Sequence, residues 1–132
     1  MATFDLATLK AADIADIKIT NPDTGEELDG VFVTVYGQDS DVYTAARRRY
    51  QARHAEYELK HRGKKMLGQA ADDTFKKLIA ESTKSVTGIS FEGKDITNAE
   101  EAFNLPGCGW LFEQVSTAMN DRSNFIKGLS AK

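Results

Sequence analysis

A short apolar strand that runs directly into a long basic helix constrains the fold of this chain more than any other feature. Residues 31–36 alternate in the manner of a β-strand, Gly37 follows them, and the polar run Gln38-Asp39-Ser40 precedes the basic residues 45–65. Asp and Ser are residues that cap helix starts, so the pattern predicts a junction between a strand and a helix. No side chain of this stretch points to covalent chemistry, and the junction therefore indicates architecture rather than an active site.

The composition is that of an ordinary globular domain. The 132 residues include 41% hydrophobic and 28% charged residues, and a chain of this length buries about two-thirds of its unfolded surface in one domain. No apolar run approaches the ~20 residues that span a bilayer, and residues 1–5 lack the basic start and apolar core of a signal peptide. Cys108 is the single cysteine, so no internal disulfide is expected and a reducing cytoplasm is the natural compartment.

Charge is distributed unevenly along the chain. Residues 1–44 hold nine acids and two bases, residues 45–65 hold eight bases and two acids, and residues 66–132 hold nine acids and seven bases. Two interpretations remain open: either one face neutralises the other within the fold, or opposite charges steer copies of the chain into head-to-tail association. Binding to nucleic acid is the weaker interpretation, because the acidic remainder would repel phosphates.

The N-terminal part predicts an antiparallel β-hairpin. Residues 14–19 and 31–36 have strand character, and the run Asn21-Pro22-Asp23-Thr24-Gly25 between them is a strong turn signal. A two-stranded hairpin is marginal alone, so it must pack on helices or pair with another strand. Its free edge is also a candidate for pairing with a neighbouring subunit.

The rest of the chain has mainly helical patterns. Helices are expected over residues 40–62, 70–83 and 97–105 and from Trp110 onward, where Asn120-Asp121 is a point of restart. Thr97 and Glu100 form a capping box for the third helix, while residues 85–91 fit a short strand or an extended loop. The sequence thus predicts an α+β fold in a single domain, residues 1–132. An antiparallel hairpin over about residues 14–36 packs against a mainly helical part of about four to five helices over about residues 40–129.

The residue types that carry chemistry do not form a recognisable active site. His54 and His61 lie near one face of the basic helix with Glu58 between them, but neighbouring Arg and Lys repel a cation and no thiolate assists, so solvated surface is expected rather than a metal site. Cys108 lies between two glycines without a nearby histidine and is interpreted as a small residue in a tight turn. Residues 107–110 lack the pattern of a phosphate-binding loop. We expect neither enzymatic activity nor a cofactor.

The candidate protein-binding residues lie at the start of the basic helix and are Tyr43, Arg47, Arg48, Arg49, Tyr50 and Arg53. Arg and Tyr are favoured at the centres of protein interfaces. Consecutive arginines point to different sides of a helix and so do not all meet one groove of a duplex, whereas stacking on single strands stays open as a weaker alternative. We expect these residues to pair with acidic groups of the same fold or of a neighbouring subunit. Trp110 is expected in the core, with exposure at an interface as the alternative.

The chain resembles the tail assembly chaperones of long-tailed bacteriophages with non-contractile tails, and three blocks carry the resemblance. The first comprises the turn Thr24-Gly25, the strand Val31–Val35, and Gly37-Gln38-Asp39-Ser40 leading into Ala45-Ala46-Arg47-Arg48-Arg49. The second comprises Leu78–Thr83 and Val86–Ile89. The third comprises Asn98–Phe103, Trp110, Gln114-Val115 and Phe125. These are scaffold motifs that cover nearly the whole chain, and none is a catalytic fingerprint.

The resemblance implies a specific, non-catalytic function. Such proteins are made in the host cytoplasm, are absent from the mature virion, and keep the long tape measure protein soluble while tail tube subunits polymerise around it. Many exist in two forms, the longer one produced by a ribosomal frameshift, and the end at Ser130-Ala131-Lys132 is consistent with the short form. The implied partners are the tape measure protein, the major tail tube protein, the longer form and further copies of the chain, with no membrane. A minor tail or connector protein of the virion, and a small nucleic-acid-binding protein, are the alternatives.

Overall fold

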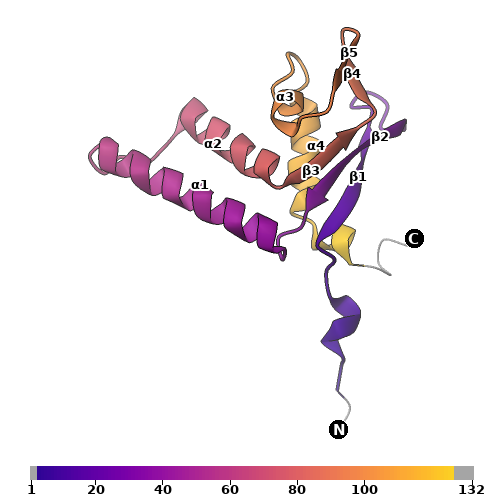
Figure 1. The fold of residues 1–132 in the computed structure, drawn as a ribbon, viewed down its shortest axis with the longest axis horizontal. Helices are drawn as coiled ribbons and strands as arrows, with labels where there is room; N and C mark the ends of the chain where they lie inside the picture. The colour runs from indigo at the N-terminus through magenta and orange to yellow at the C-terminus, as the bar shows by residue number, and fades with distance from the viewer. Residues whose placement is uncertain (1–2, 127–132) are drawn as a thin grey trace.

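The computed structural model describes residues 3–126 and has an α+β architecture, as predicted (Figure 1). The strands are β1 (Ile14–Thr20), β2 (Glu27–Tyr36), β3 (Thr83–Thr87), β4 (Ile89–Phe91) and β5 (Lys94–Ile96). The helices of the described residues are α1 (Asp41–Lys60), α2 (Gly68–Glu81), α3 (Ala99–Phe103) and α4 (Gly109–Met119), with short 3-10 turns at Leu6–Leu9 and Arg122–Phe125.

The predicted N-terminal hairpin is confirmed and forms two strands of a three-stranded antiparallel sheet in the order β1-β2-β3. Ile17 pairs with Val33, and Val33 pairs with Val86 of β3. All three side chains are buried, so they form an apolar row across the sheet on the face that the helices cover. The third strand provides the additional pairing that a two-stranded hairpin needs for stability.

The part of the chain after residue 40 contains more strand than the sequence predicted. Residues 83–87 form β3, and residues 89–91 pair with residues 94–96 in a small second hairpin. The interpretation of residues 85–91 as one short strand or loop missed the break at Gly88, which separates β3 from β4. Val86 is the single buried side chain of β3, so the strand owes its place to backbone pairing with β2 rather than to a hydrophobic pattern.

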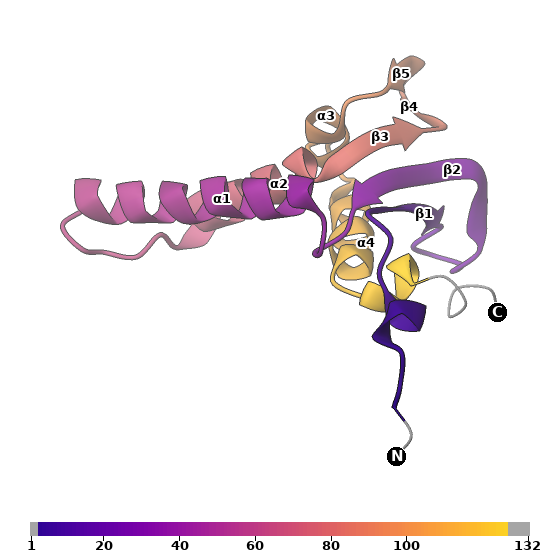
Figure 2. The ribbon, with the colours of Figure 1, turned by 60° about the horizontal axis from the view of Figure 1, so that its bottom comes forward.

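The hydrophobic core lies between the sheet and α4, which packs against β1 and β2 (Figure 2). Its fully buried side chains include Ile19, Val33, Val35, Phe103, Val115 and Met119. Gln114 of α4 fastens the helix to the end of β1: its Nε2 donates to the Thr20 carbonyl (2.9 Å), and its Oε1 accepts from the Thr20 amide (3.0 Å). Trp110 is half-buried at the edge of this core, between the two predicted environments.

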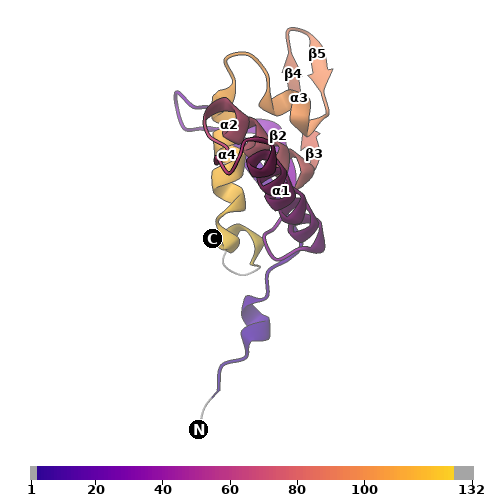
Figure 3. The ribbon, with the colours of Figure 1, turned by 90° about the vertical axis from the view of Figure 1, so that its left-hand side faces the viewer.

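Helices α1 and α2 form an antiparallel arm that projects from the body of the molecule (Figures 1 and 2), and Figure 3 views the molecule from the far end of this arm. Of the 20 residues of α1, Ala46 alone is buried. A helix that is polar on nearly all sides has little hydrophobic stabilisation of its own. The remaining side chains of α1 are therefore available, fully or in part, for contacts outside the sheet.

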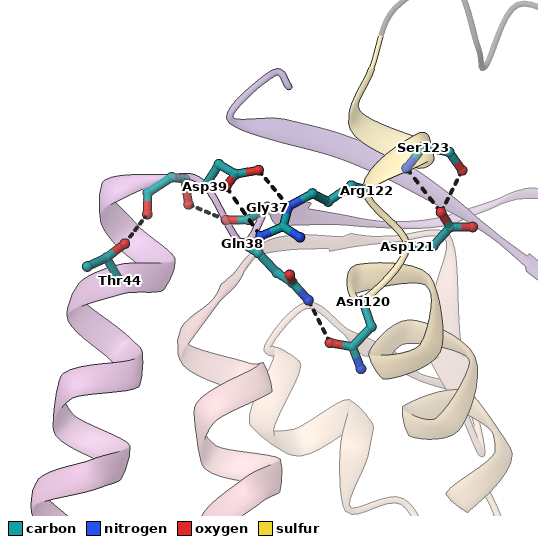
Figure 4. A network of polar contacts seen from close by, with 9 residues as sticks. Gly37, Gln38, Asp39, Thr44, Asn120, Asp121, Arg122 and Ser123 are labelled. Atoms are coloured by element: carbon teal, nitrogen blue, oxygen red, sulfur yellow. Dashed lines mark hydrogen bonds and ion pairs between the residues drawn. The ribbon is translucent and has the colours of Figure 1, made fainter. Parts of the chain in front are cut away.

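The junction between β2 and α1 is held by contacts to the C-terminal part of the described chain (Figure 4). Gln38 Nε2 donates to Asn120 Oδ1 (2.8 Å), and Arg122 Nε donates to Asp39 Oδ2 (2.9 Å). The buried Ser40 side chain accepts from the Tyr43 amide (3.2 Å) and is the N-cap of α1, one of the two caps that the sequence predicts. Each residue of the polar run thus has a separate structural role.

Gly37 of the same junction is required because an aromatic ring lies against it. A Cβ at this position would meet Cδ2 of Phe125 at 2.8 Å, which is closer than real Cβ contacts allow. Phe125 is buried in the core, and its carbonyl accepts a hydrogen bond from the Ala12 amide (2.7 Å). Phe125 therefore links the end of β2 through its ring, and the chain leading into β1 through its backbone carbonyl, to the end of the described chain.

The ends of the helices differ in detail from the predictions. The cap of α3 is Asn98, whose Oδ1 accepts from the Glu101 amide (3.2 Å), so the capping box assigned to Thr97 and Glu100 was wrong by one residue. The last helix does restart, as a 3-10 turn after Asn120. The predicted helical residues 127–129 lie outside the described residues. Within residues 3–126 no helix is long and apolar enough to cross a membrane.

Gly88→Ala is expected to destabilise the fold more than other substitutions at glycines with positive φ. Gly88 has φ +78°, and a Cβ there would collide with the carbonyl oxygen of Gly30, so we expect a loss of roughly 3–5 kcal/mol in the free energy of unfolding. Gly93→Ala is the matched control, because Gly93 has φ +83° with nothing close to a Cβ; its loss should be roughly 1 kcal/mol. Urea denaturation measures both, and equal losses would contradict the predicted collision.

Candidate protein-binding surface

The six predicted binding residues all lie on α1, but the fold divides them into two groups. Arg49 and Arg53 face α2, whereas Arg47 and Arg48 are exposed. The tyrosines are half-buried and pack toward the protein interior. The prediction that the arginine cluster pairs with acidic groups of the same fold thus describes one part of the set only.

Arg49 and Arg53 connect the two helices of the arm through a single carboxylate, that of Glu81. Arg53 donates from Nη2 to Oε2 (3.0 Å) and from Nη1 to Oε1 (3.4 Å), and Arg49 donates from Nε to Oε1 (3.3 Å). Charge-assisted hydrogen bonds with this forked geometry are stronger and more directional than ordinary hydrogen bonds. Because Glu81 is the last residue of α2, these contacts join the end of α2 to the middle of α1.

The tyrosines have mainly packing roles. Tyr43 packs against the hydrophobic core, and the Tyr50 ring makes edge contacts with His54 (4.6 Å between centroids) and with Phe75 of α2 (6.5 Å). His54 is half-buried, so the expectation that it lies on a solvated surface was wrong. The aromatic contacts supplement the Glu81 ion pairs in joining α1 to α2.

Arg47 and Arg48 are the arginines of the predicted set that contact no acidic side chain of the described residues, whereas Arg49 is exposed but pairs with Glu81. Arg47 and Arg48 are both exposed, and neither has an ion-pair partner among residues 3–126. They are one position apart on α1, about 100° around the helix axis. The basic surface that the structure offers to a partner on this side is therefore smaller than the sequence indicates.

The far end of the arm carries exposed apolar residues that the sequence analysis did not identify. We define the arm tip as residues 59–67, in which Leu59 is 85% exposed and Leu67 is 75% exposed. In the sequence Leu59 is a lone leucine among polar residues at the end of a helix, and this isolation is the signal that could have marked it. Lys60, Arg62, Lys64 and Lys65 of the same segment are also exposed, so the tip combines leucines with positive charge.

A shallow apolar pocket lies on the body of the molecule, beside the start of β2. It has a volume of about 230 Å³, and its lining includes Leu28, Val31, Ile89, Phe91, Trp110 and Cys108. Cys108 is a free cysteine at the turn before α4, in agreement with its interpretation as a small residue in a turn. The predicted core residue Trp110 thus contributes one side to this pocket.

The histidines of α1 do not form part of a metal cluster. The His61 ring stacks on Tyr57 (3.8 Å between centroids), and its Nδ1 lies 2.8 Å from the Tyr57 carbonyl oxygen. No group of three or more His, Cys, Asp or Glu residues within residues 3–126 is arranged to hold a metal ion. The expectation that the chain lacks enzymatic activity and a cofactor stays a prediction.

The ionisation of Glu81 is coupled to the arm. Burial acts to raise the pKa of this carboxyl, but the hydrogen bonds and charges of Arg53 and Arg49 outweigh burial and hold the pKa below its ordinary value. A carboxyl whose pKa is lower in the folded chain stabilises the fold when ionised. The contact between α1 and α2 should therefore weaken in acid.

Comparisons with known proteins identify no relative of this chain. The chain matches no protein-family model, no curated protein and no solved structure.

Glu81→Gln is expected to lower the free energy of unfolding by about 1 kcal/mol at neutral pH, the scale of a partly exposed, charge-assisted contact. The folded-state pKa of Glu81 is lowered. The higher free energy of unfolding of the wild type is therefore fully present above the unfolded-state pKa of Glu81 and is lost as the pH falls through the folded-state pKa. Urea denaturation of both proteins over this pH range measures the effect. Glu56→Gln, which removes an exposed ion pair with Lys60, is the control and should change stability little. A difference for Glu81→Gln that does not change with pH would contradict the assignment.

Proposed function

We propose that this protein is a tail assembly chaperone of a long-tailed bacteriophage with a non-contractile tail. In this proposal it binds the tape measure protein and tail tube subunits during tail morphogenesis without catalysing a reaction. It acts in the host cytoplasm, in several copies and together with a longer frameshifted form, and is absent from the mature virion. The observation that carries the proposal is the projecting arm of α1 and α2.

The arm suits the binding of a long helical partner. Helix α1 spans 20 residues and buries Ala46 alone, so nearly its entire length can contact another protein. A tape measure protein is long, mostly helical and apolar along one side, and would aggregate before its tube forms. A chaperone for such a protein needs many copies, each with a moderate contact area, because linked weak contacts add to a high avidity.

Charge on the arm supports the same proposal. Arg47 and Arg48 are exposed without ion-pair partners among the described residues. Exposed, unpaired arginines attract a partner protein with an acidic surface and speed its association. Pairing of Arg49 and Arg53 with Glu81 reduces the basic surface that a nucleic acid would require. The arm is therefore better suited to a protein partner than to a phosphate backbone.

The variant R47E/R48E is expected to weaken binding of the tape measure protein without unfolding the chain. The test is co-expression with the tape measure protein encoded beside it, followed by affinity purification and measurement of the soluble fraction. The wild type should keep an otherwise insoluble tape measure protein in solution, and R47E/R48E should lower its soluble fraction severalfold, because like charges at an interface are repulsive. Circular dichroism should show the same helical signal for both proteins.

The matched control is K77E/K84E, which reverses two exposed lysines that also lack ion-pair partners among residues 3–126. It changes the net charge equally and should solubilise the tape measure protein as the wild type does. A tape measure protein whose solubility is the same with and without this chain would refute the proposed function. Detection of the chain by mass spectrometry in purified virions would instead favour a minor tail or connector protein.

A further inference from the structure

The charge asymmetry of the sequence is not neutralised by ion pairs within the described residues. In the described residues, the ion pairs of residues 45–65 are those of Arg49 and Arg53 with Glu81 and that of Lys60 with Glu56. None of these reaches the acidic residues 1–44. Direct ion pairs therefore do not join the basic segment to the acidic one among residues 3–126, and the interpretation that one complements the other within the fold stays a prediction.

A basic part of one segment and an acidic part of the other lie at opposite ends of the molecule. The arm tip is at one end of the longest axis, and the turn between β1 and β2 is at the other (Figures 1 and 2). We define the hairpin end as residues 21–30; it holds four acids, Asp23, Glu26, Glu27 and Asp29, and no lysine or arginine. The arm tip holds four bases and no acid. All eight charged side chains are exposed.

Each end also has an apolar element. Leu28 of the hairpin end is one of the residues that line the apolar pocket of the body, so the pocket lies beside the acidic hairpin end. The arm tip has the exposed side chains of Leu59 and Leu67 among its lysines. A leucine surrounded by positive charge and an apolar pocket beside negative charge are complementary in both hydrophobicity and sign.

We propose that the arm tip of one copy docks on the hairpin end of the next copy, with Leu67 or Leu59 entering the apolar pocket. The occupant of the pocket is thus a second copy of the same chain. Because the two surfaces differ and lie at opposite ends, the contact is heterologous and repeats from copy to copy. The result is an open filament or a closed ring rather than a two-fold dimer.

This inference rests on the proposed function, in which several copies of the chain act together. The experiment that tests the inference uses the purified chain alone. Sedimentation velocity is measured for the wild type, for K64E/K65E in the arm tip and for E26K/D29K in the hairpin end. These four positions are exposed and have no ion-pair partner among residues 3–126. Each double variant leaves one of its two ends with two charges of each sign and so with no net charge. The attraction between its own copies is then largely lost, so we expect its self-association to weaken at least about tenfold.

Mixing the two double variants provides the decisive comparison. In the mixture, the unchanged basic tip of E26K/D29K can meet the unchanged acidic hairpin end of K64E/K65E, so association between the two variants should return although neither variant associates alone. The variant K77E/K84E, with the same charge change outside both surfaces, should associate like the wild type. Association should also be stronger at about 0.01 M ionic strength, where the Debye length is about 30 Å, than at about 1 M, where it is about 3 Å.

Three results would overturn the proposal: a wild type that stays monomeric at low ionic strength, a double variant that associates like the wild type, or folded variants whose mixture stays monomeric. Circular dichroism establishes that each variant is folded.

If a charge variant does not fold, L59S/L67S takes its place, because it removes the apolar part of the tip. L59S/L67S should weaken self-association. The control is V42S, which changes an exposed apolar residue near the base of the arm and should leave self-association unchanged. Unchanged association of L59S/L67S would also overturn the proposal. A wild type that does not self-associate would refute this inference but not the proposed function, which is tested separately by the solubility of the tape measure protein.

Discussion

The contact between Phe125 and Gly37 is the constraint on which the rest of the structure depends. The strand end has no side chain at residue 37, so the ring of Phe125 can lie directly on the backbone where β2 gives way to α1. The next residues use this closeness: Gln38 bonds to Asn120, and Asp39 pairs with Arg122. Since Ser40 then caps α1, the direction in which the arm leaves the sheet follows from a contact made by the end of the described chain.

A helix directed away from the core needs other means to stay folded. In α1 the hydrophobic contribution is small, and the arm depends on Glu81 and on the edge contact between Tyr50 and Phe75. Partly exposed ion pairs contribute modestly, so the far end of the arm has few contacts beyond its own helix hydrogen bonds. Such regions are the low-stability part of a fold, and elements that bind partners are commonly drawn from them.

Local patterns in the sequence were sufficient for the hairpin and limited the cap of α1 to Asp39 or Ser40, because alternation and capping depend on neighbouring residues. They were insufficient for β3, which buries Val86 alone and exists through pairing with β2, a contact between distant parts of the chain. For the same reason, the sequence did not distinguish the arginines that pair with Glu81 from those that do not. Whether a position on α1 is structural or exposed depends on where Glu81 lies, and helical spacing alone does not contain this information. The exposure of Leu59 likewise follows from the projection of the arm, which no local pattern encodes.

The placement of charge finally bears on what the chain can do as an assembly. The basic arm tip and the acidic hairpin end lie at opposite ends of the molecule, so they do not meet within one copy (Figure 1). A heterologous contact between such ends would use the arm tip and leave the middle of α1, with Arg47 and Arg48, exposed on every copy. Assembly would then repeat one weak binding surface at a regular spacing. A repeated weak surface is what an extended partner requires for avid yet reversible binding, and the same charge segregation thus serves both proposals.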